Sequence, residues 1–152
     1  MTGPGLRAIV LALSLSAPTA VYAEVLAWTT VSGQLALLDL ETGQMPASLK
    51  KMDGAVVRVP GFVIPLEDND QSVSEFLLVP YPMACIHVPA PPPNLIVHVK
   101  MEKGKKIAFN FYDPVWMQGC LKIQRTQSIY TESSYFMTGL SVEPYKPERK
   151  SP

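Results

Sequence analysis

Apolar and polar side chains alternate with a period of two from Met52 onward, and turn-forming residues separate the alternating runs. This pattern is typical of β-strands that bury one face. The chain also has 15 prolines in 152 residues, several of them in one cluster. A proline inside a helix removes a hydrogen bond and clashes with the preceding turn, so this content opposes a helical bundle. The sequence therefore predicts a mainly β protein.

Five strands are predicted, at residues 55–64, 75–81, 95–101, 114–123 and 134–145. Gly61 interrupts the first of them, which indicates a bulge or sharp bend of the kind that closes a small barrel. Five short strands and one bent strand favour a small OB-like barrel. A β-sandwich is the runner-up, because the number of strands alone does not separate the two architectures.

The segments outside the strands divide the rest of the chain. Residues 1–23 are predicted to be a cleaved signal peptide, because Arg7 precedes a short apolar stretch and Val21-Tyr22-Ala23 resembles a cleavage site. Residues 24–50 form an N-terminal extension that fits a helix or a strand equally well, residues 51–145 the OB-like β domain, and residues 146–152 a loose tail. We therefore expect a periplasmic, soluble protein. It should not span a membrane, since no later stretch approaches about 18 consecutive apolar residues.

The charge balance limits the classes of partner. Thirteen basic and thirteen acidic residues cancel, so no strong field attracts nucleic acid. The two cysteines are too few for a disulfide scaffold or an all-cysteine zinc site.

One stretch combines residue types that bind metals. Cys85 and His87 are two residues apart, so in an extended chain they point to the same side. His98 lies on the next run and points away from the core face of Val97, Val99 and Met101. A hairpin centred on the intervening prolines would place Cys85 opposite His98. One thiolate and two imidazoles suit zinc or copper, and the thioether of Met83 is a candidate fourth ligand.

Other interpretations of this stretch stay open. Cys85 and Cys120 could instead form a disulfide, and His98 could simply be a half-exposed histidine with a backbone partner. The loop of Pro89, Pro91, Pro92, Pro93 and Asn94 could dock on another protein as a polyproline II segment.

Catalysis has less support. Cys85 could act as a nucleophile with His98 as its base, but no carboxylate in the stretch would orient the histidine. Motifs of serine hydrolases, phosphate loops and zinc proteases are absent from the sequence.

Residues 52–98 resemble a bacterial family known as domain of unknown function 3299. The resemblance rests on Asp53-Gly54, Gly61-Phe62-Val63, Pro65-Leu66-Glu67, the run at 75–81, Ala84-Cys85-Ile86-His87-Val88-Pro89 and Pro91-Pro92-Pro93-Asn94. Pro114-Val115-Trp116, with Gly119 and Leu121, is similar to the family's closing strands. Ala90 and Leu95 depart from the pattern, at positions where the family usually has proline and glutamine.

The resemblance implies an exported protein linked to ABC-type transporters and to metal handling. Together with the residue types, it leads us to expect a metal-binding accessory protein with Cys85, His87 and His98 as ligands. An envelope or ABC-transporter protein is the expected partner. The alternatives are a protein-interaction module that uses the Pro-rich loop and a thiol-dependent enzyme.

Overall fold

The computed structural model describes residues 24–25, 34–67, 71–82 and 90–146. The long strands are β2 (Val56–Pro65), β4 (Glu75–Val79), β5 (Val97–Met101), β7 (Val115–Gln127) and β8 (Glu132–Pro144). The short elements are β1 (Glu24–Val25), α2 (Ala47–Lys50), β3 (Ser72–Val73), η1 (Pro93–Leu95), η2 (Glu102–Gly104) and β6 (Ile107–Ala108). The five predicted strands are all present. β7 and β8 form a longer hairpin than expected, because β7 continues to Gln127.

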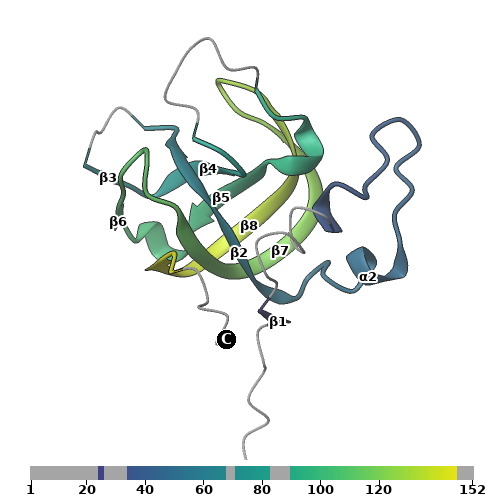
Figure 1. The fold of residues 1–152 in the computed structure, drawn as a ribbon, viewed down its shortest axis with the longest axis horizontal. Helices are drawn as coiled ribbons and strands as arrows, with labels where there is room; N and C mark the ends of the chain where they lie inside the picture. Colours follow the sequence, from purple (N-terminus) through teal and green to yellow (C-terminus); the bar gives the residue numbers. More distant parts are fainter. Residues whose placement is uncertain (1–23, 26–33, 68–70, 83–89, 147–152) are drawn as a thin grey trace, which may run out of the picture.

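The strand pairings close a ring. β2 pairs with β4, β4 with β5, β5 with β8 and β8 with β7, and β7 returns to β2 (Figure 1). All of these pairs are antiparallel except β5–β8, which is parallel. The protein is therefore mainly β with an OB-like barrel, as predicted.

Gly61 marks the point where β2 changes partners. Residues Val56 to Gly61 pair with β7, whereas Phe62 to Pro65 pair with β4. A Cβ atom at position 61 would collide with the Leu78 side chain and approach the Val79 carbonyl oxygen to 3.1 Å. Only glycine therefore lets the two strands approach so closely here.

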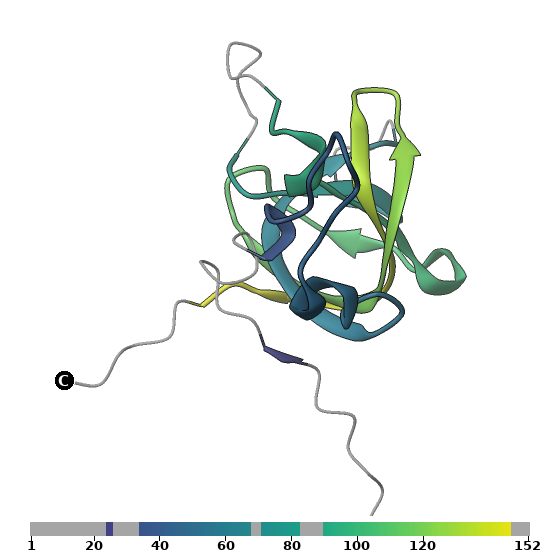
Figure 2. The ribbon, with the colours of Figure 1, turned by 90° about the vertical axis from the view of Figure 1, so that its right-hand side faces the viewer.

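The barrel interior follows the predicted alternation. Val57, Val59 and Val63 from β2 and Val97, Val99 and Met101 from β5 all belong to one buried core. The N-terminal segment also enters this core: Leu35, Leu38 and Leu49 are at most 8% exposed, whereas Leu37 is 53% exposed. This segment, which includes α2, covers one side of the barrel (Figure 2).

β4 is buried on both of its faces. Phe76 and Leu78 face the main core, whereas Leu77 and Val79 belong to a second cluster with Ile96. Phe62, Ile64 and Leu66 from β2 and the residue after it pack against this second cluster. The apolar run at residues 76–79 is thus continuous because the strand has no solvent-facing side.

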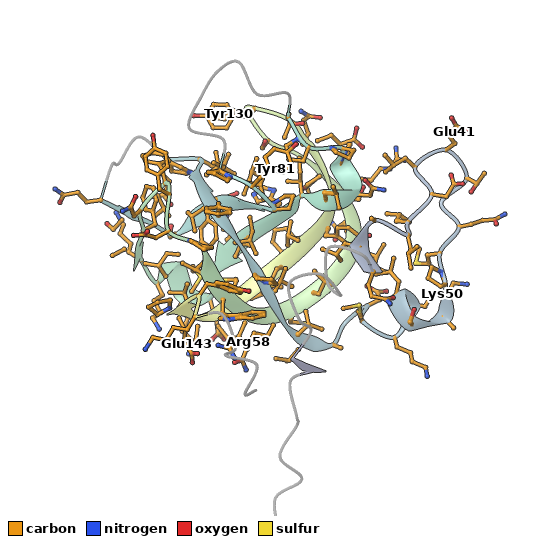
Figure 3. The ribbon with its side chains drawn as sticks, viewed as in Figure 1. Glu41, Lys50, Arg58, Tyr81, Tyr130 and Glu143 are labelled. Atoms are coloured by element: carbon orange, nitrogen blue, oxygen red, sulfur yellow. The ribbon has the colours of Figure 1, made fainter. Side chains whose placement is uncertain are left out.

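An ion pair and a stacked cation lie beside the β2–β7 pair. The guanidinium Nη2 of Arg58 is 2.6 Å from Glu143 Oε2, and its Cζ lies 4.7 Å from the centre of the Trp116 ring (Figure 3). Such a guanidinium over an indole contributes about 0.5–1 kcal/mol at an exposed site.

Several sequence predictions lie outside the described residues. They are the signal peptide at 1–23, Met83, Cys85, His87 and Pro89, and most of the tail. No helix in the described part of the chain is long and apolar enough to cross a membrane. Cys120 is a free thiol whose Sγ lies 3.4 Å from the Gly54 carbonyl oxygen.

Candidate ligand pocket

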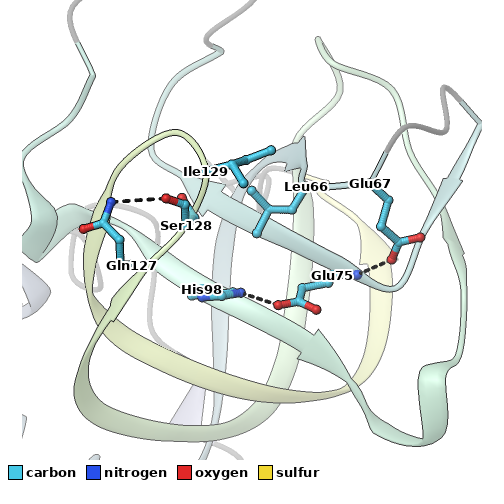
Figure 4. A pocket seen from close by; sticks show the side chains of 7 residues that line it. All are labelled: Leu66, Glu67, Glu75, His98, Gln127, Ser128 and Ile129. Carbon is cyan, nitrogen blue, oxygen red and sulfur yellow. Dashed lines mark hydrogen bonds and ion pairs between the residues drawn. The ribbon is translucent and has the colours of Figure 1, made fainter.

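His98 and Glu75 form the polar floor of a pocket on the outer face of the barrel. In the β4–β5 register Glu75 stands opposite Lys100, and Leu77 stands opposite His98. Glu75 and His98 are therefore diagonal neighbours on one sheet face, within reach of each other's long side chains. His98 Nε2 lies 2.9 Å from Glu75 Oε1 (Figure 4).

The imidazole of His98 has a hydrogen-bond partner at each ring nitrogen and contacts one aromatic ring. Its Nδ1 lies 3.0 Å from Thr126 Oγ1, which in turn lies 2.6 Å from Ser133 Oγ. Phe136 makes an edge-to-face contact with the ring at 5.6 Å. In the neutral ring Nε2–H donates to the Glu75 carboxylate, so Nδ1 accepts from the Thr126 hydroxyl.

Glu75 is an anion held between two donors. Partial burial raises the pKa of its carboxyl, but hydrogen bonds from His98 and from the Lys100 ammonium group outweigh this effect and lower the pKa overall. Lys100 Nζ lies 3.3 Å from Glu75 Oε2, and the lysine side chain is 63% exposed. Exposed pairs of this kind contribute little to stability.

Glu67 provides the second carboxylate. Its Oε1 accepts hydrogen bonds from the Ser74 hydroxyl at 2.5 Å, the Ser74 N–H at 2.8 Å and the Glu75 N–H at 2.9 Å. The hydroxyl and then the backbone N–H of Ser74 lower the pKa of Glu67. These bonds tie the segment after β2 to the start of β4.

The pocket between these groups has a volume of about 460 Å³. Its lining residues are Leu66, Glu67, Glu75, His98, Gln127, Ser128 and Ile129 (Figure 4). They come from the β2–β4 connection, from β4 and β5, and from the tip of the β7–β8 hairpin. Ser128 shapes that tip, because its Oγ donates to the Thr131 carbonyl oxygen and accepts from the Tyr130 and Thr131 N–H groups.

One protein family and one solved structure match this chain. Residues 28–144 match the family described as "Protein of unknown function (DUF3299)". This chain belongs to the DUF3299 family. A crystal structure of a DUF3299 family protein from Pseudomonas aeruginosa PAO1 is 34% identical, with a TM-score of 0.57, over 83% of this chain and 86% of that one. No curated protein matches the chain.

The strand pairings of β5 contradict the predicted hairpin around the Pro-rich loop, which would have brought Cys85 opposite His98. Both edges of β5 are occupied: His98 stands opposite Leu77 on β4 and Phe136 on β8. The register that would pair Cys85 with His98 is therefore wrong. In the described ranges no group of three or more His, Cys, Asp or Glu side chains could hold a metal ion. The ligand set of Cys85, His87 and His98 stays a prediction, because Met83, Cys85 and His87 lie outside those ranges.

The described end of the Pro-rich loop contributes to the fold. Pro91 is buried, Pro92 is exposed, and Pro93 begins η1. Asn94 Nδ2 donates to the carbonyl oxygens of Ala36 and Leu38, both at 3.1 Å. Asn94 thus joins the loop to the N-terminal segment.

Sequence reasoning missed most of the pocket. Only His98 was predicted as a site residue. Glu67 and Glu75 lie in runs that match the family pattern, whereas Gln127, Ser128 and Ile129 belong to no motif. The predicted OB-like architecture could have indicated the position of the pocket. OB folds bind ligands on the face of strands 2 and 3, between the loops that join strands 1–2 and 4–5. In this barrel those parts are β4, β5 and the two connections that line the pocket.

A row of hydrogen bonds runs from Glu75 through His98 to the hydroxyl of Thr126. A carboxylate, a histidine and a hydroxyl do lie in a row, as in nucleophilic enzymes. Thr126 Oγ1 is, however, held between His98 and Ser133, and Thr126 does not line the pocket. The row therefore orients the floor of the pocket.

Proposed function

We propose that this DUF3299 protein is an exported accessory protein that binds a ligand in the pocket floored by His98 and Glu75. The observation that carries the proposal is the position of the pocket: it lies on β4 and β5, between the β2–β4 connection and the β7–β8 tip. This is the region where OB folds bind ligands. Fold alone does not define the ligand, so the chemistry of the lining residues must do so.

The pocket is organised before a ligand arrives. His98 is only 8% exposed and has partners at both ring nitrogens, and Glu67 is fixed by three hydrogen bonds. A ligand therefore meets polar groups that are already oriented, which reduces the entropic cost of binding. The volume of the pocket lies within the range of about 300–1,000 Å³ that is typical of small-molecule sites.

A fragment screen by NMR tests this function on the purified chain. Fragments of neutral, anionic and cationic character are added, and the signals of His98 and Ile129 are followed. We expect a subset to shift these signals, and Gln127→Trp to abolish the shifts by filling the mouth of the pocket. Gln124→Trp, on the same strand but outside this pocket, serves as the control. If no fragment of any class moves these signals, the pocket does not bind ligands.

Metal handling is the second candidate function. Cys85, His87 and His98, with Met83 as a fourth ligand, would bind zinc or copper, and an ABC-type transport system is the proposed partner. One observation favours it: metal-binding histidines commonly pair with a carboxylate, and His98 pairs with Glu75. One of the two ring contacts of His98 would have to give way to the metal.

Metal content separates the two functions. We expect the purified wild-type chain to contain about one equivalent of zinc or copper if the second function holds. Cys85→Ala, His87→Ala and His98→Ala should each lower that content, whereas Cys120→Ala should not. Equal metal content in all five proteins would exclude the proposed ligand set and leave the ligand pocket unaffected.

A further inference from the structure

Two carboxylates with fixed orientation give the pocket its charge. Glu67 and Glu75 both line it, and both are bound through donors that stabilise the anionic form. The three hydrogen bonds of Glu67 all end on Oε1, so Oε2 takes no part in them. Among the described cations, Lys100 pairs with Glu75 at 3.3 Å, and Lys106 acts on Glu67 only through a longer-range attraction.

Lys100 is a replaceable partner. Its ammonium group lies 3.3 Å from Glu75 Oε2, and the side chain is 63% exposed. Because an exposed ion pair is worth about 0–1 kcal/mol, a second cation can take the place of Lys100 at little cost. The contact shows that Glu75 accepts an ammonium group in this geometry.

Two of the lining residues, Leu66 and Ile129, are apolar. Leu66 and Ile129 lie next to each other, across the pocket from His98 and Glu75 (Figure 4). Ile129 and its neighbour Tyr130 are 76% and 64% exposed at the tip of the β7–β8 hairpin. Together they extend an apolar surface beyond the mouth of the pocket.

A ligand that fits must combine an aliphatic body with a cationic end. Lysine and arginine side chains have this composition, with an apolar stem and a charged head. We infer that the pocket binds a basic side chain of a partner polypeptide, with its charged head at Glu67 and Glu75 and its stem against Leu66 and Ile129. Tyr130 would then contact the neighbouring residues of the partner, since tyrosine is enriched at protein interfaces. This inference rests on the proposed function and names its ligand class.

Short peptides test the inference directly. The probes are acetyl-Leu-Arg-Leu-amide, the same peptide with norleucine in place of arginine, and ethylguanidine, with binding measured by NMR titration of the full chain. We expect the arginine peptide to bind at least about tenfold more tightly than the norleucine peptide. Ethylguanidine should bind more weakly than the arginine peptide, because it lacks the contacts to Ile129 and Tyr130.

Charge variants give the sharper readout. Glu75→Gln and Glu67→Gln should each weaken binding of the arginine peptide by about tenfold. Lys100→Met removes the internal competitor and should tighten binding by about threefold, an effect that a merely structural lysine would not produce. Glu41→Gln, in the N-terminal segment far from Tyr130, is the control and should leave binding unchanged (Figure 3). A melting curve of each variant shows whether it is folded.

The outcomes that would contradict the inference differ in what they imply about the ligand. If the norleucine peptide binds equally well, or Glu67→Gln and Lys100→Met both leave affinity unchanged, the pocket does not select a cation. If ethylguanidine binds as tightly as the arginine peptide, the partner is not a polypeptide. Neutral or anionic fragments that displace signals of His98, without any effect of the peptides, would overturn the inference while the proposed function stands.

Discussion

The hydroxyl of Tyr135 donates a hydrogen bond of 2.7 Å to the carbonyl oxygen of Leu35, a residue 100 positions earlier in the chain. Tyr135 is fully buried, and burial raises the pKa of its hydroxyl far above the usual value. The hydroxyl therefore stays protonated and acts as a donor. The contact attaches the N-terminal segment to β8 within the main core.

Replacing Tyr135 by phenylalanine should destabilise the protein by about 0.5–1.5 kcal/mol, because the Leu35 carbonyl oxygen loses its side-chain donor and keeps only the Leu38 N–H. The ring itself stays, so no large cavity forms. Urea unfolding followed by fluorescence measures the change. Tyr112→Phe, at a position that is 67% exposed, is the matched control and should change stability by less than about 0.5 kcal/mol. Equal midpoints for both variants would show that the N-terminal segment is not anchored through this bond.

Asn94 makes the second attachment of the same segment. Its Nδ2 donates to two carbonyl oxygens, of Ala36 and Leu38. Asn94→Ala removes both bonds and should cost about 1–2 kcal/mol. Asn94→Asp should cost more, since it places a carboxylate against two carbonyl oxygens. The order wild type, Ala, Asp in thermal melting temperature is the expected result. A docking loop without a structural role would give three equal melting temperatures.

Gly119 lies at an irregularity in the β7–β8 register, between Gln118 and Gly119. A Cβ atom there would collide with the Thr138 carbonyl oxygen and come within 2.6 Å of Met137 Cγ. The backbone of β8 cannot move aside as a flexible side chain would. Gly119→Ala should therefore destabilise the protein by about 1–3 kcal/mol. Lys122→Ala, exposed on the same strand, should have almost no effect. If both variants unfold at the same urea concentration, the close approach does not limit stability.

Local sequence patterns predicted the strands but not the pocket. The alternation of Val97, Val99 and Met101 marks a buried strand face whatever the neighbouring strand is, and Gly61 allows a close strand approach because it lacks a side chain. By contrast, the partner of His98 depends on which strand lies beside β5 and in which register. The sequence predicted a hairpin around the Pro-rich loop because the two arms of that hairpin are close in sequence. The fold instead places β4 and β8 there, which brings Glu75 to the imidazole.

The N-terminal segment shows the same limit. Leu35, Leu37, Leu38 and Leu40 fit a helix or a strand equally well by pattern. In the structure Leu35 and Leu38 are buried and Leu37 is exposed, a spacing of three that follows a helical turn. The segment adopts the helical turn because it packs against one side of the barrel and accepts hydrogen bonds from Tyr135 and Asn94. Neither partner is close in sequence.

Glu67 should make the stability of the protein depend on pH in the acidic range. Its pKa in the folded protein lies below the usual value of 4.5, chiefly because the Ser74 hydroxyl and N–H donate to the carboxylate. A depressed pKa means that the folded state favours the anion, so the stabilisation is complete above the unfolded pKa and is lost as the pH falls through the lower, folded one. Wild type should therefore be more stable than Glu67→Gln at pH 7, and the difference should shrink only below about pH 4.5. Urea midpoints of both proteins between pH 7 and pH 2.5 measure it, with Glu41→Gln as the exposed control. A difference that stayed constant down to the lowest pH would mean that the three hydrogen bonds act through geometry and not through the charge of Glu67.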